Sequence, residues 1–233
     1  MDVSVVLPTY NERDNIVPLI EAIDRELTSA GISYEVVVVD DNSPDGTAQA
    51  VRARFGDQAN VRLIVRTEGR GLATAIAYGI RHAEGDCIAV MDTDFNHDPV
   101  LLPQMVRFLE YYDIIIGSRF TMGGGMEEKW RYLASFVFNF LVRQVLRTQI
   151  QDNLCGFFTM RRDKLMAMDI ERIFQGYGEY FMHLLFQSWR QGYKMLEVPA
   201  FYRARTYGQS KSRFFSMLYH YTLTAIRVRL GKR

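Results

Sequence analysis

The first 120 residues alternate between short runs of apolar residues and longer segments in which apolar residues recur every three or four positions. The run at 34–39, with four consecutive valines, is typical of strands that are buried on both faces. In the segment 15–30 the apolar residues share one helical face, and Gly31 follows as a stop signal, so we predict a helix there.

This alternation continues to residue 117 and defines the expected fold. We predict strands at 3–7, 34–39, 61–65, 87–91 and 113–117, and helices at 15–30, 45–55, 73–83 and 100–109. Strands that alternate with helices form a parallel sheet with helices on both faces. We therefore expect an α/β fold with a doubly wound, mostly parallel, Rossmann-like sheet.

The pattern changes after Arg119. The segment 121–126 contains three consecutive glycines, so we predict a flexible loop that acts as a lid. The segments 132–146 and 214–230 are rich in Phe, Leu and Tyr with scattered Arg, which predicts C-terminal amphipathic helices. Because no long linker or internal repeat separates the parts, we expect a single domain over 1–233 with two halves, 1–120 and 121–233.

Composition and charge narrow the classes of partner. The chain has 233 residues, 48% of them hydrophobic, which is enough for one sizeable domain with a buried core. Its net charge of +1 argues against a general nucleic-acid binder. Residues 198–233 nevertheless contain eight Lys or Arg and no acid, and 129–151 contain four and none. Such segments are either solvated basic surfaces or faces that meet an anionic membrane or a phosphorylated substrate.

Cysteine content and hydropathy indicate the compartment. Cys87 and Cys155 do not make a disulfide framework, which is consistent with a reducing cytoplasmic setting. No signal-peptide pattern precedes the first predicted strand. The most apolar stretch, 132–142, is shorter than the about 20 residues that a membrane-spanning helix needs. We therefore expect a cytoplasmic protein.

An Asp-x-Asp motif is the first candidate for chemistry. Asp92 and Asp94 follow the apolar run 87–90, so both carboxylates are expected at the carboxyl edge of the sheet, where open α/β folds bind ligands. Mg²⁺ is typically held by one or two carboxylates together with substrate phosphates. Two acids in a loop also commonly cap or solvate a turn. The motif alone leaves both interpretations open.

Other nucleotide and catalytic motifs are missing from the sequence. The first predicted strand is followed by PTYNE at 8–12 rather than by a glycine-rich turn. Gly69 and Gly71 precede a predicted helix, but Thr74 occupies the third glycine position, so we reject dinucleotide binding. The chain has no P-loop, no G-x-S-x-G elbow and no Cys/His cluster suited to zinc.

Several further motifs follow predicted strands, in a fixed order. They are PTYNE (8–12), VDDNSPDGT (39–47), MDTDFNH (91–97) and GSR (117–119), with RTYGQSK (205–211) near the C-terminus. Together these motifs resemble glycosyltransferase family 2, whose members have the GT-A fold, and more closely the dolichol-phosphate (polyprenyl-phosphate) mannosyltransferases. The resemblance covers essentially the whole chain. It implies a nucleotide-sugar-binding half at 1–120 and an acceptor- and membrane-facing half at 121–233.

The resemblance also implies a role for each matching residue. The base and ribose of a nucleoside diphosphate sugar would meet Pro8, Tyr10, Glu12, Val39 and Asp41. The sugar nucleotide would contact Asp92, Thr93 and Asp94, and Mg²⁺ or Mn²⁺ would be held by Asp92, Asp94 and Asn96. Phosphates would be bound by Arg119, Arg205 and Lys211. Lys129 and Arg131 follow the glycine loop, where they would meet the lipid phosphate. Asp94 and Arg119 would be catalytic. The alternatives are a strand-end turn for the acids and surface ion pairs for the cations.

The implied reaction transfers mannose from GDP-mannose to a polyprenyl phosphate with inversion. The metal and the cations would stabilise the departing pyrophosphate. A lipid phosphate has a second pKa of about 6, so it is mostly dianionic at neutral pH and needs no general base. We expect Asp152, in QDNLCGF at 151–157, to be an acceptor-site or structural residue, and we expect His97 to have a packing role. His183 stands where many relatives carry an acid.

Polyprenyl phosphates reside in membranes, so we expect the chain to dock on the cytoplasmic face of one, alone or through a membrane-anchoring partner protein. The aromatic and basic residues suited to such an interface are Phe136, Phe140, Phe214, Phe215, Tyr219, Tyr221, Arg143, Arg147, Arg213, Arg227 and Arg229. The alternative is that these aromatics face the core. For 136–146 both interpretations stay open, and for the C-terminal helix we favour the interface.

Two rival functions remain at this point. The first keeps the lipid phosphate but takes UDP-glucose or a related donor in place of GDP-mannose. The second, from another class, is a non-catalytic partner subunit that binds a sugar nucleotide. The intact Asp-x-Asp motif and the matching cations argue against the second.

Overall fold

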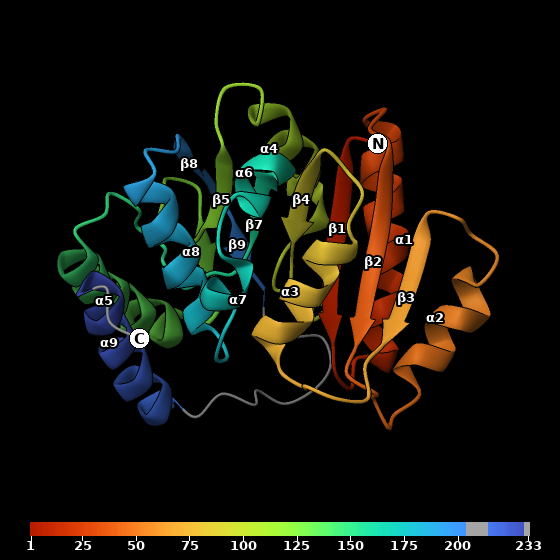
Figure 1. Ribbon diagram of the computed structural model, residues 1–233, viewed down its shortest axis with the longest axis horizontal. Helices are drawn as coiled ribbons and strands as arrows, with labels where there is room; N and C mark the ends of the chain where they lie inside the picture. The colour runs from red at the N-terminus through yellow and green to blue at the C-terminus, as the bar shows by residue number, and fades with distance from the viewer. Residues whose placement is uncertain (204–213, 231–233) are drawn as a thin grey trace.

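A seven-stranded sheet forms the centre of the computed structural model, which describes residues 1–203 and 214–230, with the backbone alone for 214–220. The strand order is β3-β2-β1-β4-β7-β5-β8 (Figure 1). The strands are β1 (Val3–Thr9), β2 (Tyr34–Asp40), β3 (Val61–Val65), β4 (Cys87–Val90), β5 (Ile114–Ser118), β7 (Phe158–Arg161) and β8 (Met195–Pro199). The pairs β1–β2, β1–β4, β2–β3 and β5–β8 are parallel. The prediction of a mostly parallel α/β sheet is therefore confirmed.

The helices of the first half lie between the strands as the sequence pattern predicts. They are α1 (Arg13–Ser29), α2 (Thr47–Phe55), α3 (Leu72–His82) and α4 (Leu102–Phe108), the last preceded by the short 3₁₀ helix η1 (Pro99–Leu101). Helix α3 covers one face of β1 and β2, whereas α1 lies on the other face (Figure 1). Gly79 permits this close packing, because a Cβ there would lie 3.1 Å from Cγ2 of Val39 and still closer to Val6.

The strand order creates a crevice at the carboxyl edge of the sheet. From β1 the chain proceeds outward to β2 and β3, and then returns to add β4 on the opposite side of β1. Open α/β sheets bind ligands at such a reversal, because the loops after the two central strands separate there. The loops that follow β1 and β4, which contain PTYNE and the Asp-x-Asp motif, are therefore neighbours.

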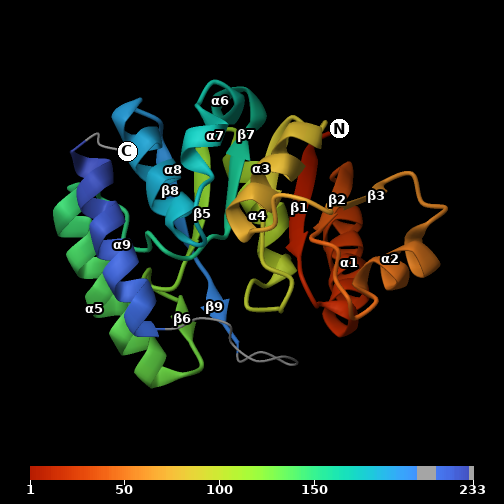
Figure 2. The same cartoon turned by 60° about the horizontal axis from the view of Figure 1, so that its bottom comes forward.

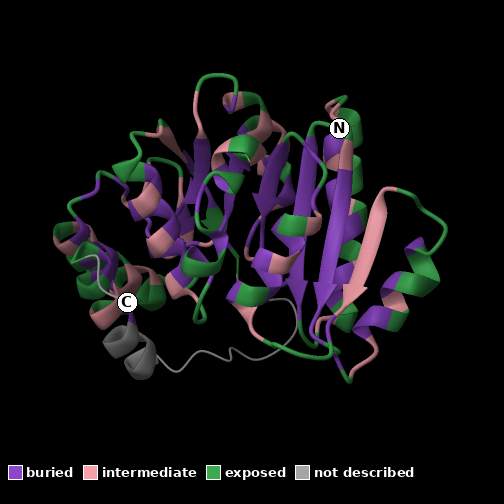
Figure 3. Cartoon of the chain, viewed as in Figure 1, coloured by how far each residue is buried: buried purple, intermediate pink, exposed green. Residues whose placement is uncertain are grey.

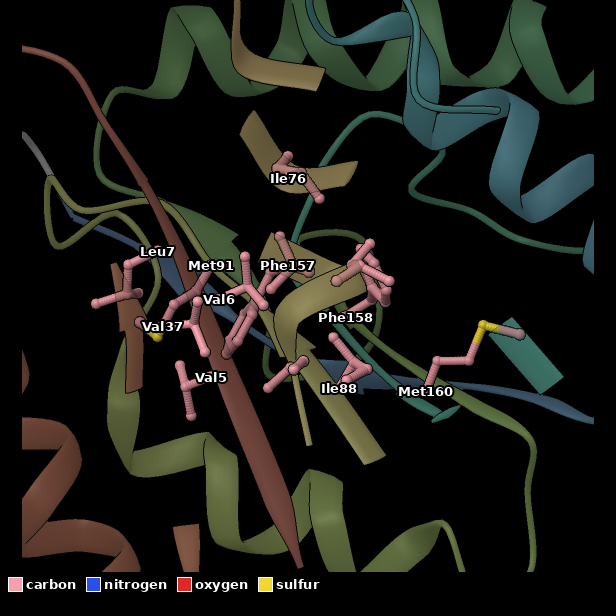
Figure 4. Close-up of a cluster of buried hydrophobic side chains, with 14 of the residues drawn as sticks. Val5, Val6, Leu7, Val37, Ile76, Ile88, Met91, Phe157, Phe158 and Met160 are labelled. Carbon is pink, nitrogen blue, oxygen red and sulfur yellow. The ribbon is translucent and has the colours of Figure 1, made fainter. Parts of the chain in front are cut away.

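The second half contains elements that the sequence pattern did not predict. Strand β7 enters the sheet antiparallel to both β4 and β5. The other new elements are the helices α6 (Arg162–Met166), α7 (Ile170–Ile173) and α8 (Glu179–Arg190), strand β8, and a small sheet of β6 (Gly125–Met126) and β9 (Phe201–Tyr202). The main core joins both halves, because side chains from β1, β2, α3, β4 and β7 meet in it (Figure 4).

The glycine segment at 121–126 differs from the predicted flexible lid. Its last residues form β6, which pairs with β9, and the N–H of Gly125 donates to the carbonyl of Ala200 at 3.1 Å. At Gly124 the backbone lies directly against the carbonyl of Ser118 and against Arg119, so a side chain there would collide with them. The glycines thus allow the loop to pack on the GSR turn, and the prediction of a free lid is wrong for this part.

Two long helices complete the second half. Helices α5 (Lys129–Leu146) and α9 (Phe214–Arg229) lie side by side at the end of the molecule away from β3 (Figure 2). A second hydrophobic cluster joins them to α8, and its buried members are Phe138, Val142, Leu146, Met182, Phe186, Tyr221, Ala225 and Val228. The strands β1 and β2 are buried along most of their length, whereas the outer side of α5 is largely exposed (Figure 3). Across 1–203 and 214–230, no helix combines the length and apolarity needed to cross a bilayer.

Candidate active site

The loops at the carboxyl edge of the sheet enclose a cavity of about 450 Å³, which we call the motif pocket. Its lining residues come from the end of β1, from the loops after β1, β2, β3 and β4, and from the start of α3, with one contribution from the loop before α8. They are Pro8, Thr9, Tyr10, Glu12, Asp41, Arg70, Gly71, Leu72, Ala75, Asp92, Thr93, Asp94 and Tyr177. The structure thus brings together seven of the residues that the resemblance assigned to the sugar nucleotide.

A second cavity of about 180 Å³ adjoins the first, and we call it the arginine pocket. Three arginines contribute to its wall: Arg119, Arg131 and Arg203. Leu72, Asp92 and Tyr177 line both pockets. Asp92 therefore stands where the two cavities meet, which is the arrangement that a reaction between two bound substrates requires.

Asp41 is held in a buried ion pair at the wall of the motif pocket. Nε of Arg66 donates to Oδ1 of Asp41 at 2.7 Å, and the N–H of Gly71 donates to Oδ2 at 2.8 Å. Arg66 also donates to the carbonyl of Gly71 at 3.2 Å. The carboxylate thus fixes the glycine turn that forms one side of the pocket. Arg66 was not singled out from the sequence, because its role depends on a contact between two different strand-end loops.

The loop after β2 is organised by two further aspartates. Asp40, fully buried, accepts hydrogen bonds from the backbone N–H of Ser43 at 2.9 Å and from the hydroxyl of Thr9 at 3.1 Å. Asp45 accepts from the N–H groups of Arg13 and Thr47 at 3.1 and 3.0 Å. For these two acids the structural alternative, a turn and helix cap, is what the structure shows.

Tyr10 and Arg70 face each other at the rim of the motif pocket. The guanidinium of Arg70 lies 5.7 Å from the centre of the Tyr10 ring, within the range of a cation–π contact. An exposed aromatic ring with a planar cation beside it is suited to stack against a nucleobase. In the sequence only the glycines on either side of Arg70 stood out, so its contribution to the pocket was missed.

The Asp-x-Asp loop is held in a strained, defined conformation. Asp94 accepts hydrogen bonds from the backbone N–H and the side-chain amide of Asn96, at 3.2 and 2.8 Å. Between them Phe95 has a φ of 61°, a left-handed conformation that is unusual for a bulky residue. Asn11 and Asn42, in the loops after β1 and β2, also have positive φ values. Backbone strain of this kind concentrates at functional sites.

The donor atoms of this loop suit a hard divalent cation. The side chain of Asp92 is 40% exposed, Asp94 supplies a second carboxylate, and Asn96 adds an amide beside it. Mg²⁺ typically binds one or two carboxylates and completes its coordination with water and substrate phosphates. In the part of the chain that the structure describes, no group of three or more His, Cys, Asp or Glu side chains surrounds a common point. The loop therefore fits a metal that is shared with a phosphorylated ligand.

Arg119 is anchored by Asp152 in the arginine pocket. Nε and Nη2 of Arg119 each donate to the carboxylate of Asp152 at 2.7 Å, and its backbone N–H donates at 3.1 Å. Burial alone would lower the pKa of Arg119, but the charge of Asp152 and its hydrogen bonds raise it above the usual value. Both side chains are buried, so Arg119 remains a fixed positive charge. Of the two roles expected for Asp152, the structure shows the structural one.

The loop that contains Asp152 is held in turn by Glu197 on β8. The carboxylate of Glu197 accepts from the N–H groups of Gln151 and Asp152 at 2.8 and 2.9 Å. Burial raises the pKa of Glu197. Because β8 pairs with β5, which ends at Ser118, the strand pairing itself sets the distance between Arg119 and its anchor.

The remaining predicted residues fall in three places. Arg131, at the start of α5, lines the arginine pocket and pairs with Glu128 at 3.0 Å. Val39 is fully buried in β2 beneath α3 and lines neither pocket. Arg205 and Lys211 lie outside the described residues. Asn96 lines the arginine pocket rather than the motif pocket.

His97 is fully buried behind the Asp-x-Asp loop. Burial lowers its pKa to about 4, although Asp94 and the carbonyl of Cys155 partly offset this effect, so the ring is neutral near pH 7. It stacks on Phe157 with ring centres 4.8 Å apart. The packing role expected from the sequence is present, and the ring also makes hydrogen bonds to Asp92 and Tyr202.

Comparisons with known proteins agree with this geometry. The family model described as Glycosyl transferase family 2 matches residues 4–168. A dolichol-phosphate mannosyltransferase of Pyrococcus furiosus is 34% identical over 217 residues, which are 91% of this chain and 59% of that protein. This chain therefore spans less than two thirds of that relative. An undecaprenyl-phosphate mannosyltransferase of Micrococcus luteus is 34% identical over 218 residues, covering 91% of this chain and 87% of the relative.

Solved structures show the same fold. Glucosyl-3-phosphoglycerate synthase from Mycobacterium tuberculosis, crystallised with Mn²⁺, UDP and phosphoglyceric acid, superposes with a TM-score of 0.76 at 19% identity. The superposition covers 100% of this chain and 79% of that one. The predicted GT-A type of α/β fold is thereby confirmed. The extent of the family match and the identity to these relatives show that the chain belongs to glycosyl transferase family 2.

Proposed function

We propose that the chain is a metal-dependent, inverting mannosyltransferase that moves mannose from GDP-mannose to a polyprenyl phosphate at a membrane surface. The meeting of the motif pocket and the arginine pocket at Asp92 supports this proposal most strongly. The names of the Pyrococcus and Micrococcus relatives support the sugar and the class of acceptor.

The motif pocket is the proposed site of the donor nucleotide. Tyr10 and Arg70 offer stacking surfaces for a base, and Glu12 and Asp41 offer acceptors for ribose hydroxyls or base N–H groups. The diphosphate would extend toward Asp92 and Asp94. A divalent ion, Mg²⁺ or Mn²⁺, held there with Asn96 would neutralise charge on the leaving diphosphate.

The arginine pocket is the proposed site of the acceptor phosphate. Arg119 presents a charge that Asp152 fixes in place, and Arg131 and Arg203 add cations that are more exposed. A phosphomonoester has a second pKa of about 6, so at neutral pH its oxygen attacks the anomeric carbon without a general base. Attack from the arginine pocket, on the side opposite the leaving diphosphate, inverts the anomeric configuration. Arg205 and Lys211 follow Arg203 in the sequence and keep their proposed role at phosphates.

The outer face of α5 is the proposed membrane-docking surface. Its exposed large apolar side chains recur at helical spacing and are Trp130, Leu133, Phe136, Val137, Phe140 and Leu141. Trp130 is 76% exposed, and Arg143 lies over the Phe140 ring at 5.9 Å. An apolar stripe flanked by basic residues is typical of helices that lie in the membrane interface. Arg131 lies on the same helix and lines the arginine pocket, so docking through this stripe would bring the lipid phosphate near that pocket.

On α9, the interface expected from the sequence is wrong for Tyr221, whereas Arg227 and Arg229 are exposed. Tyr221, expected at the membrane, is buried against α5 and α8, and Ala225 and Val228 are buried with it. Among the side chains described on α9, the inward face is therefore apolar and holds α5 in place. The side chains of Phe214, Phe215 and Tyr219 lie outside the described part.

Two measurements test the proposed function. Isothermal titration with GDP-mannose and with UDP-glucose, each with and without Mn²⁺, identifies the donor and the metal requirement. We expect metal-dependent binding of GDP-mannose, and preferential binding of UDP-glucose would favour the rival donor. Transfer of radiolabelled mannose to a polyprenyl phosphate should then stop in EDTA and resume with Mn²⁺. Nucleotide binding without any transfer would instead support a non-catalytic partner subunit.

A further inference from the structure

A continuous chain of hydrogen bonds runs through His97 beneath the two pockets. The backbone N–H of Asp92 donates to Nδ1 of His97 at 2.8 Å. On the other side of the ring, Nε2 lies 2.8 Å from the hydroxyl of Tyr202 and 3.2 Å from the carbonyl of Cys155. The Tyr202 hydroxyl lies 3.1 Å from the same carbonyl. His97, Tyr202 and Cys155 are all buried.

These contacts assign the tautomer of the ring. A backbone N–H can only donate, so Nδ1 of His97 must accept and the ring proton resides on Nε2. That Nε2–H then donates to Tyr202, whose own hydroxyl proton is directed to the carbonyl of Cys155. Nε2 lies 3.8 Å from Oδ2 of Asp92, which is beyond hydrogen-bond distance. The ring therefore holds the backbone of Asp92 rather than its carboxylate.

The chain of bonds joins parts of the site that are distant in the sequence. Asp92 belongs to the loop after β4, and Tyr202 lies on β9, at a sequence separation of 105 from His97. Cys155 belongs to the loop whose Asp152 anchors Arg119. The Arg119 guanidinium also lies 4.9 Å from the centre of the Tyr202 ring. Stacking on Phe157, with the two rings inclined by 10°, fixes the plane of the imidazole.

We propose that His97 is a positioning residue that fixes the aspartates of the Asp-x-Asp loop relative to the arginine pocket. It does so through its hydrogen bonds to the N–H of Asp92 and the hydroxyl of Tyr202. This inference rests on the proposed function, because transfer requires the metal-binding carboxylates to be aligned with the acceptor phosphate. Groups that orient metal ligands without touching the metal typically change metal affinity or activity by about 10–100-fold when they are removed.

Two substitutions separate the halves of the hydrogen-bond chain. In His97→Asn, the amide oxygen occupies roughly the position of Nδ1 and still accepts from Asp92. In His97→Gln, the amide nitrogen occupies roughly the position of Nε2 and still donates to Tyr202. His82→Gln is the matched control, because His82 is a partly buried histidine on α3 that bonds the Tyr78 carbonyl and lines neither pocket.

The first readout is the affinity for GDP, measured by titration calorimetry with and without Mn²⁺. Mn²⁺ should raise the GDP affinity of the wild type by some factor, and in His97→Gln we expect that factor to be smaller by about 10-fold or more. His97→Asn should keep most of that gain, and His82→Gln all of it. Melting temperatures are measured in parallel. If the Asn and Gln variants lose Mn²⁺-dependent GDP affinity equally, and in proportion to the fall in their melting temperatures, His97 is purely structural and the proposal is overturned.

The second readout is spectroscopic and needs no ligand. Long-range ¹H–¹⁵N spectra of the full chain report which ring nitrogen carries the proton, and the signal absent in His97→Gln identifies His97. We expect protonated Nε2 and unprotonated Nδ1. A proton on Nδ1 contradicts the positioning role alone. A wild-type chain that binds neither GDP nor UDP with Mn²⁺ contradicts the proposed function, so the two failures are distinguishable.

Discussion

The motif pocket and the arginine pocket share Asp92 but are built in different ways. In the motif pocket, loops that directly follow parallel strands supply most of the wall. Hydrogen bonds from the same loop or the next one hold the polar groups of these loops, as Asn96 holds Asp94. In the arginine pocket, Arg119 depends on Asp152, 33 residues later, on a loop that Glu197 holds from β8. The motif pocket is thus built from consecutive strand–helix units, whereas the arginine pocket depends on the completed fold.

The largest effect is expected in the Asp-x-Asp loop, at Asp94 beside the shared residue Asp92. Replacing Asp94 with Asn should lower mannose transfer by about 10²–10³-fold, because a charge that balances the leaving diphosphate is lost. Metal-dependent GDP binding should fall as well, with little change in melting temperature, since Asn keeps the size of the side chain. Radiolabel transfer and calorimetry provide the measurements. Asp86→Asn, in an exposed residue beside the opposite end of β4, is the control, and wild-type turnover in Asp94→Asn would remove the metal argument.

The second effect tests the dependence of the arginine pocket on long-range contacts. Asp152→Leu leaves Arg119 buried without its partner, which should lower the free energy of unfolding by about 3–5 kcal/mol. Replacing both residues, Arg119→Met with Asp152→Leu, should cost much less, because no unpaired buried charge remains. Denaturant unfolding curves measure these two variants and the single variant Arg119→Met. If the double variant loses as much as the two single variants added together, the pair is not coupled and the contrast between the pockets weakens.

The third effect concerns α5, the proposed membrane-docking surface. Leu133→Asp with Phe140→Asp should weaken binding to anionic vesicles at least about tenfold, because burial of each large apolar side chain contributes about 1.5–3 kcal/mol. GDP affinity should stay the same, since both side chains are already exposed. Vesicle co-sedimentation provides the measurement, with Tyr111→Asp as an exposed apolar control away from α5. Unchanged sedimentation would contradict docking through α5.

Deletion of the C-terminal helix is a poorer test of docking. Tyr221, Ala225 and Val228 fill the cluster that joins α9 to α5 and α8, so their removal would disturb folding and docking together.

The smallest effect lies within the motif pocket. Arg70→Ala should weaken GDP binding about two- to fivefold, as expected for an exposed cation–π contact of about 0.5–1 kcal/mol. Calorimetry without transfer is sufficient. Arg54→Ala is a matched control, because Arg54 makes a similar contact with Phe55 at 5.1 Å on α2 and lines neither pocket. Equal weakening by both substitutions would indicate a general effect of charge rather than stacking at the base.

The same contrast explains what the sequence could predict. Periodicity identified β1 to β5 and their helices, because each is a continuous segment whose burial pattern repeats. The motifs PTYNE and Asp-x-Asp were placed correctly at the carboxyl edge, because parallel strands bring their ends together. Strand β7 was missed: it is four residues long, and its place between β4 and β5 depends on partners far away in the sequence.

Individual residues show the same limit. Arg66 and Arg70 had no local signal that distinguished them from ordinary surface arginines. His97 was assigned to packing because its partner Tyr202 becomes a neighbour only after β9 is in place. The glycines at 123–125 suggested mobility, whereas Gly124 permits contact with the carbonyl of Ser118. In each case the role of the residue depends on contacts with distant parts of the chain, which residue type alone does not reveal.

We propose that one divalent ion, bound at Asp92 and Asp94, joins the two pockets. A crystal of the full chain soaked with GDP and Mn²⁺, with data collected for the anomalous signal of manganese, tests it most directly. We expect one anomalous peak within about 2.0–2.3 Å of a carboxylate oxygen of Asp94 and of a diphosphate oxygen, with guanine beside Tyr10. A peak elsewhere, or a nucleotide bound with both aspartates turned away from it, would rule out a metal-bridged site.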